Sequence, residues 1–195
     1  QRSISSAAAA ADAPLDEAWR DRLDGLLDLG RAAGADLVEV FLERTDSLSV
    51  SAEQDRITSV TPSFGMGAGL RVFLGQRDGF VSTNDLSDRG LRLALEQALG
   101  MLGLQVQPLA TMAFQGLGGL RQYASGKHDW LQRSPGLAEV TATLLQGTDH
   151  LERHGQHLQA RRGSYARSWQ EVLVAASDGT FSRDVRLHQT TALNV

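Results

Sequence analysis

Residues 38–60 read VEVFLERTDSLSVSAEQDRITSV, and this stretch decides the fold class because apolar and polar side chains alternate along it. The apolar positions recur at every second residue over 38–42, again over 48–52, and more briefly over 57–60. A period of two is typical of β-strands that bury one face. We therefore expect three short strands, separated by turns at Thr45–Asp46 and Gln54–Asp55.

The alternation continues downstream, where 70–74 and 79–83 predict two more strands. The intervening gaps, at 61–67 and 75–78, are too short to hold crossover helices. Strands joined by such short connections favour an antiparallel meander over a parallel sheet.

Helical periodicity flanks the meander on both sides. One helix is expected to begin near Asp12 and Pro14 and to end at Gly34, because Asp is a common N-cap and Gly a common C-terminal residue. Ser87 is positioned to cap a second helix over 88–102, and a third is expected over 136–158.

Alternating runs return over 164–169, 171–176 and 180–193, and Asp178-Gly179 between the last two is a strong hairpin signal. The order of elements predicts an α+β fold, an antiparallel meander sheet with long helices packed on one face. We expect residues 1–13 to be a disordered tail, 103–135 a long surface excursion, and 14–195 one domain that is truncated at its C-terminal end. An uncovered apolar face on the last strand would then promote self-association.

Composition excludes several function classes. The 195 residues carry a net charge of −4, which argues against a general nucleic-acid binder. Cysteine is absent, which excludes disulfides, thiolate metal sites and cysteine nucleophiles. No stretch approaches the roughly 20 apolar residues that span a bilayer. We expect a cytoplasmic protein with no membrane partner.

Three histidines on the third expected helix suggest a metal site. His150 and His154 are four residues apart and could grip one ion, whereas His157 would lie about 10 Å from His150 along the helix. No glutamate follows either histidine in the manner of helical zinc proteases. A solvated helix flank is the favoured interpretation, and metal binding by His150 and His154 stays open.

Residues 65–69 are rich in glycine, as dinucleotide-binding loops are. Such a loop lies between a strand and a helix, whereas this segment lies between two expected strands, so a dinucleotide-binding loop is not expected. We expect Gly67 and Gly69 to be required by a positive φ or by a close backbone neighbour.

The serines lack a Gly-x-Ser-x-Gly context. Glu39 and Glu43 indicate a solvent face, and the basic residues Arg161, Arg162 and Arg167 indicate a solvated edge.

An ordered set of motifs resembles the TldD/PmbA family. The set covers most of the chain, and its pieces are individually short: Gly34-Ala35-Asp36, Val38-Glu39-Val40, the serine-alternating Leu48–Ser51, Asp55-Arg56-Ile57, Gly67–Phe73, Gly79–Leu86 and Ser177-Asp178-Gly179. The resemblance implies an N-terminal α+β domain of a protein about twice as long, with the active site in the missing half.

Members of the TldD type are similar to zinc metallopeptidases with a His-Glu-x-x-x-His motif; they pair with a PmbA-type (TldE) subunit and are often labelled modulators of DNA gyrase. The resemblance therefore implies peptide maturation or degradation, a peptide substrate and a partner subunit. None of the five histidines here is followed by Glu. We therefore assign no catalytic, cofactor-binding or metal-binding residue in this chain. We expect the zinc site to lie beyond Val195, and we expect this segment to be inactive alone. A non-catalytic PmbA/TldE-type partner subunit is the alternative.

Overall fold

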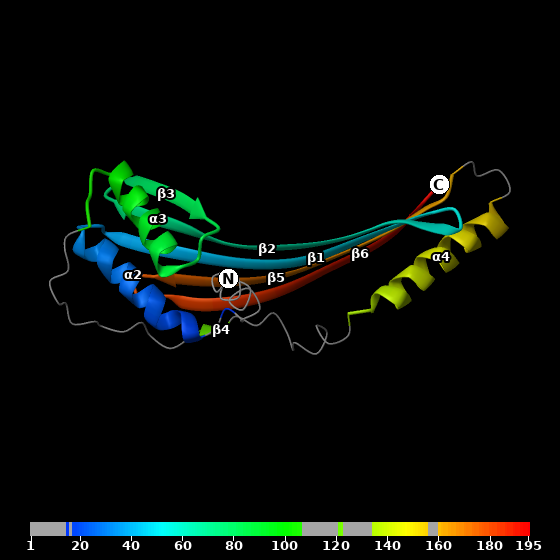
Figure 1. Cartoon of the computed structure of the whole chain (residues 1–195), viewed down its shortest axis with the longest axis horizontal. Coiled ribbons are helices and arrows are strands. Elements are labelled where there is room, and N and C mark those ends of the chain that lie inside the picture. Colours follow the sequence, from blue (N-terminus) through cyan, green and yellow to red (C-terminus); the bar gives the residue numbers. More distant parts are fainter. Residues whose placement is uncertain (1–14, 16, 107–120, 123–133, 156–159) are drawn as a thin grey trace, which may run out of the picture. The chain divides into compact units, whose positions relative to one another are not determined.

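The computed structural model describes residues 15, 17–106, 121–122, 134–155 and 160–195 (Figure 1). The strands form one sheet in the order β3-β2-β1-β5-β6-β4. The elements are η1 (Glu17–Trp19), α2 (Arg20–Ala32), β1 (Leu37–Glu53), β2 (Arg56–Leu74), β3 (Arg77–Thr83), α3 (Asp88–Met101), β4 (Arg121–Gln122), α4 (Leu137–His154), β5 (Arg162–Ala176) and β6 (Phe181–Asn194).

The chain divides into two compact units, each built from several segments. The first unit comprises residues 1–44, 66–123 and 171–184, and the second comprises 45–65, 124–170 and 185–195. Among the residues that the structure describes, no helix is both long and apolar enough to cross a membrane.

The first unit packs α2 and α3 against one face of its strands (Figure 1). Its core joins leucines of both helices to every second residue of β1 and β2, among them Val38, Val40, Leu70 and Val72, which are fully buried. β2 and β3 pair antiparallel, with Leu70 opposite Val81 and Val72 opposite Gly79. The alternation in the sequence therefore identified the buried face correctly, and the predicted α+β fold with antiparallel strands is confirmed.

Two glycines allow the backbones of the first unit to pack very closely. A Cβ atom at Gly79 would lie 2.3 Å from the carbonyl oxygen of Ala98 in α3, and one at Gly90 would lie 2.3 Å from the carbonyl oxygen of Asp85. The predicted cap is confirmed, because the Ser87 hydroxyl accepts a hydrogen bond from the Gly90 amide at 3.0 Å. These contacts fix α3 on β3 and on the turn before it.

The second unit places α4 over its own part of the sheet. Its core contains Val140 and Leu144 of α4, together with Val50 and Ala52 of β1 and Tyr165 of β5. Leu193 of β6 packs against α4 and β5 where two glycines leave space. A Cβ atom at Gly147 would lie 2.9 Å from the Leu193 side chain, and one at Gly163 would lie 3.5 Å from it.

The expected short strands are in fact segments of long ones. The predicted turns at Thr45–Asp46 and over 61–67 are wrong, because β1 and β2 continue through them, and the runs over 164–169 and 171–176 form a single strand, β5. Polar residues such as Thr45 do not interrupt a strand whose backbone pairs on both sides. Pro62 lies where β2 has no described neighbour on its outer side, and proline is tolerated at such edges.

Helix ends differ from their predicted places. α2 begins at Arg20 after a 3₁₀ turn, while Asp12 and Pro14 lie outside the described residues. Gly34 follows α2 with φ of 99°, as a C-terminal glycine should. α4 ends at His154 instead of Leu158, with Gly155 as its C-cap, because glycine disfavours continuation of a helix. The expected tail over 1–13 and most of the expected excursion over 103–135 lie outside the described residues.

The predicted Asp178-Gly179 hairpin is confirmed. Gly179 has φ of 96° and its amide donates to the Ala176 carbonyl at 3.0 Å, while the Ala176 amide donates to the Thr180 carbonyl at 2.9 Å. The Asp178 carboxylate accepts a hydrogen bond from the Thr180 amide at 2.9 Å. This bond holds the pKa of Asp178 below its ordinary value.

A pH dependence follows from this turn. Because the folded-state pKa of Asp178 is lowered, the charged carboxylate contributes stability above the ordinary pKa of 3.8, and the contribution is lost as the pH falls through the folded-state value. Asp178→Asn retains an acceptor but removes the charge. Urea unfolding should show wild type more stable than Asp178→Asn at pH 6, with the difference shrinking toward pH 2. A difference that does not change over this range would contradict the assignment.

Candidate binding site

Two of the three histidines predicted on one helix lie within the described residues. His150 is an exposed residue of α4, His154 is the last residue of that helix, and His157 lies outside the described residues. Among the described residues, no group of three His, Cys, Asp or Glu side chains is arranged to hold a metal ion. Metal binding by His150 and His154 stays a hypothesis, and the candidate site is better sought elsewhere.

The glycines of β2 serve packing. Neither Gly67 nor Gly69 has a positive φ, so the other predicted reason, a close backbone neighbour, is the one that can apply. The close approach is confirmed for Gly67, where a Cβ atom would lie 3.0 Å from the Asn84 side chain and 3.3 Å from the Thr83 carbonyl oxygen. At Gly69 the neighbour is a side chain, since a Cβ atom would lie 3.0 Å from the Phe80 ring.

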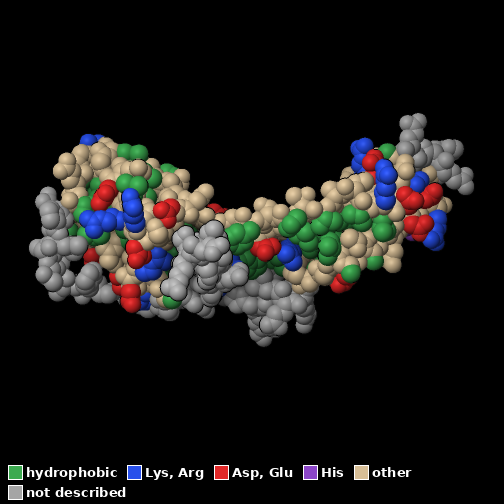
Figure 2. Space-filling model, viewed as in Figure 1, with side chains coloured by type: hydrophobic (Ala, Val, Ile, Leu, Met, Phe, Trp, Pro, Cys, Tyr) green, Lys and Arg blue, Asp and Glu red, His purple; other side chains and the backbone are tan. Residues whose placement is uncertain are grey.

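The basic stretch at the start of β5 is neutralised by acids that are distant in sequence. Arg161 pairs with Glu152 of α4 at 3.2 Å, Arg162 with Glu53 of β1 at 3.4 Å, and Arg167 with Asp46 of β1 at 3.0 Å. Figure 2 shows charges of both signs intermixed over this part of the molecule. These ion pairs offset the positive charge of the stretch, which therefore does not favour a polyanion-binding surface, and the interpretation as a solvated edge stays a prediction.

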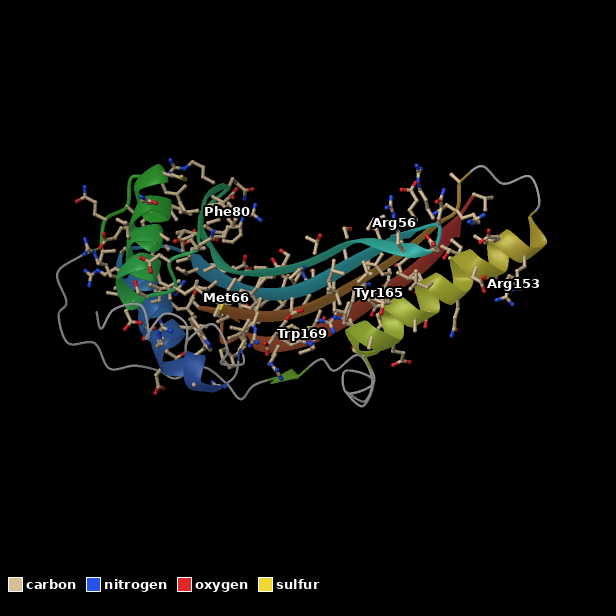
Figure 3. All side chains as sticks on the ribbon, turned by 45° about the vertical axis from the view of Figure 1, so that its right-hand side comes forward. Arg56, Met66, Phe80, Arg153, Tyr165 and Trp169 are labelled. Atoms are coloured by element: carbon tan, nitrogen blue, oxygen red, sulfur yellow. The ribbon has the colours of Figure 1, made fainter. Side chains whose placement is uncertain are left out.

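The second unit contains a pocket between the first turns of α4 and the strands β5 and β6. Its volume is about 110 Å³, enough for a medium-sized side chain or several water molecules. Figure 3 shows Tyr165 beside the first turns of α4, whereas Arg153 lies toward the other end of this helix. The lining residues are Pro135, Glu139, Val140, Thr143, Leu144, Tyr165 and Thr191.

The pocket combines an apolar floor with an oxygen-bearing rim. Val140, Leu144 and the ring of Tyr165 belong to the buried core, whereas Glu139 and Thr143 are exposed. Every polar side chain in the lining carries oxygen and none carries nitrogen. Within the described residues, Glu139 has no ion-pair partner, since the acids that pair are others. The site therefore favours a ligand that donates hydrogen bonds and carries positive charge.

The sheet edge beside this pocket is open along the described chain. On its outer side β6 pairs only with β4, at Ser182 and Arg183. The remainder of β6, which includes the pocket residue Thr191, has no described strand beyond it. An open edge presents backbone N–H and C=O groups that an additional strand can pair with.

A buried ion pair in the first unit was missed by the sequence analysis. Glu171 of β5 is fully buried, and its Oε1 atom accepts from Arg183 Nε at 2.7 Å and from the Leu15 amide at 3.1 Å. Its Oε2 atom has no hydrogen-bond partner among the described residues. A polar position inside an alternating run was the only signal available in the sequence, and it did not indicate which partner the carboxylate would meet.

Comparison with known proteins gives two sequence matches. Residues 38–102 match the family model described as PmbA/TldA metallopeptidase domain 1. A curated protein of Haemophilus influenzae, named Metalloprotease PmbA homolog, is 34% identical over 82 residues. That match covers 42% of this chain and 18% of the relative, so the aligned part spans less than a fifth of the relative's length.

Solved structures resemble the fold over nearly the whole chain. TldE from Thermococcus kodakarensis matches with a TM-score of 0.64 and 17% identity, over 88% of this chain and 39% of that one. A protein titled as a putative modulator of DNA gyrase from Bacteroides thetaiotaomicron matches with a TM-score of 0.65 and 13% identity, over 92% and 40%. At such identities the likeness establishes the fold alone.

Proposed function

We propose that this chain, which belongs to the TldD/PmbA family, is the first domain of a metallopeptidase subunit acting on unfolded or extended peptides. The observation that carries the proposal is the match of residues 38–102 to the family's metallopeptidase domain 1. The domain would extend over 14–195 and work in the cytoplasm beside a TldD/PmbA-type partner subunit.

The described residues do not fit the zinc ion that the family name implies. No histidine of the chain is followed by glutamate, and among the described residues no group of three His, Cys, Asp or Glu side chains could hold a metal ion. The proposal therefore assigns metal binding and hydrolysis to residues after Val195. The role of this chain would be to bind the peptide substrate and the partner subunit.

Open strand edges supply a means of holding an unfolded peptide. An extended peptide can add to a sheet edge through main-chain hydrogen bonds, which depend little on its sequence. Side-chain pockets next to the edge then add preference at alternate positions. The outer edge of β6 with the adjoining pocket has both features.

A non-catalytic PmbA/TldE-type subunit is the second candidate. The curated relative is named a PmbA homolog, and TldE shares the fold. In that case the domain would have the same peptide- and partner-binding role, whereas the catalytic zinc would belong to the partner subunit.

We predict that the 195-residue chain cleaves no peptide, because it lacks the metal-binding motif. Casein incubated with the purified chain and zinc should remain intact by mass spectrometry. A longer protein that includes the residues following Val195 should degrade casein in a chelator-sensitive manner, alone or with its partner subunit. Cleavage by the short chain, or intact casein with both longer subunits present, would contradict the proposal.

A further inference from the structure

We propose that the pocket between α4 and β6 receives a basic side chain with an aliphatic stem, lysine or arginine, from an extended peptide that adds as a strand to the outer edge of β6. The inference rests on the proposed function, because it names the edge and the side-chain class that the peptide-holding domain would select. Two observations support the inference: the outer edges of β2 and β6 differ, and the pocket is lined by an apolar floor and an oxygen-bearing rim.

The two outer edges of the second unit differ in their suitability for an added strand. β2 is also open over 56–65, since β3 pairs only with residues 68–74 of β2. Pro62 lies in that open segment and lacks an amide hydrogen, which is a common protection against strand addition. After Asp184, β6 contains no proline, and Arg186 is the one Asp, Glu, Lys or Arg residue in it. The β6 edge is therefore the better template.

The pocket lies where a strand on β6 would present its side chains. Thr191 belongs both to β6 and to the pocket wall. The side chain opposite Thr191 on an added strand would point to the same face of the sheet, with its Cβ about 5 Å from that of Thr191. That face is the one that α4 covers, because Leu193, two residues further on, packs against Gly147 of α4.

Charge and polarity select the class of side chain. The stem of a lysine or arginine can lie on Val140, Leu144 and the Tyr165 ring, while its charged end reaches the rim. At the rim, the Glu139 carboxylate and the hydroxyls of Thr143 and Thr191 are acceptors for its N–H groups. An acidic side chain would meet the Glu139 carboxylate and be rejected.

The test pairs two peptides with two protein variants. The probes are fluorescein-labelled heptapeptides, Thr-Val-Thr-Lys-Thr-Val-Thr and the same sequence with norleucine in place of lysine. Fluorescence anisotropy with the intact 195-residue chain should show about fivefold tighter binding of the lysine peptide. In Glu139→Gln the two peptides should bind equally. Glu96→Gln, which makes the same charge change on α3 of the first unit, should retain the preference.

Hydrogen exchange locates the peptide and separates this inference from the proposed function. We expect the lysine peptide to protect amides within 186–194 and to leave those of 56–65 unchanged. Peptide binding with no effect of Glu139→Gln, or with protection along 56–65 instead, would overturn the inference and leave the proposed function standing. Failure of both peptides to bind would overturn both.

Discussion

Replacement of Gly79 by alanine should destabilise the protein by about 3 kcal/mol. The added Cβ atom would lie 2.3 Å from the carbonyl oxygen of Ala98 and 3.2 Å from Cβ of Met101. The first of these contacts is with helix backbone, which cannot rotate away as a side chain can. β3 and α3 would have to separate, and the packing of Leu95 and Leu99 beneath them would be lost. Urea-induced unfolding followed by circular dichroism measures the effect.

The control is Gly100→Ala on α3, the helix that packs against Gly79. A Cβ atom at Gly100 would meet nothing within 4 Å, and alanine favours the helix over glycine by about 1 kcal/mol. We therefore expect Gly100→Ala to leave stability unchanged or raise it. If both variants shift the urea midpoint downward by the same amount, close packing of α3 on Gly79 is not the cause.

Replacement of Arg183 by alanine should cost about 3–5 kcal/mol at neutral pH. It would leave the fully buried Glu171 carboxylate with the Leu15 amide as its one described donor. The exposed pair of Arg71 and Asp78, which are 2.9 Å apart, is the control. Because solvent screens that pair, Arg71→Ala should cost less than about 1 kcal/mol.

A double variant separates the net contribution of the Glu171–Arg183 ion pair to stability from the cost of leaving one of its charges buried and unpaired. Glu171→Leu with Arg183→Met removes both charges and keeps apolar volume, so its stability should return close to that of wild type. Wild type, Arg183→Ala, Arg71→Ala and the double variant should be compared by urea unfolding at one pH. A double variant as unstable as Arg183→Ala would show that these positions matter for packing and not for charge.

Features set by local sequence were predictable. Alternation over 38–42 and 70–74 identified the buried face, because a strand has only two faces and the core covers one of them. Ser87 and Asp178-Gly179 were recognised because caps and tight turns depend on side chains within three residues of the backbone that they stabilise.

Features set by distant contacts were not predictable. Gly79 resembles any other strand glycine until Ala98 is placed against it, and Glu171 resembles a solvent-facing residue until Arg183 lies beside it. The turns placed at Thr45–Asp46 and 61–67 failed because neighbouring strands supply pairing that no local preference reveals. For the same reason the pocket, which joins Glu139 to Tyr165 and Thr191, had no signal in the sequence.

We propose that this domain holds extended peptides with little regard to their sequence. The most direct test is a fluorescence anisotropy titration of the 195-residue chain into a labelled, unstructured twenty-residue peptide, repeated with a scrambled version of the same composition. We expect saturable binding of both peptides with similar affinity, because main-chain hydrogen bonds at a strand edge would supply most of the binding free energy. No rise in anisotropy at protein concentrations up to about 1 mM, which corresponds to a binding free energy weaker than about −4 kcal/mol, would contradict it.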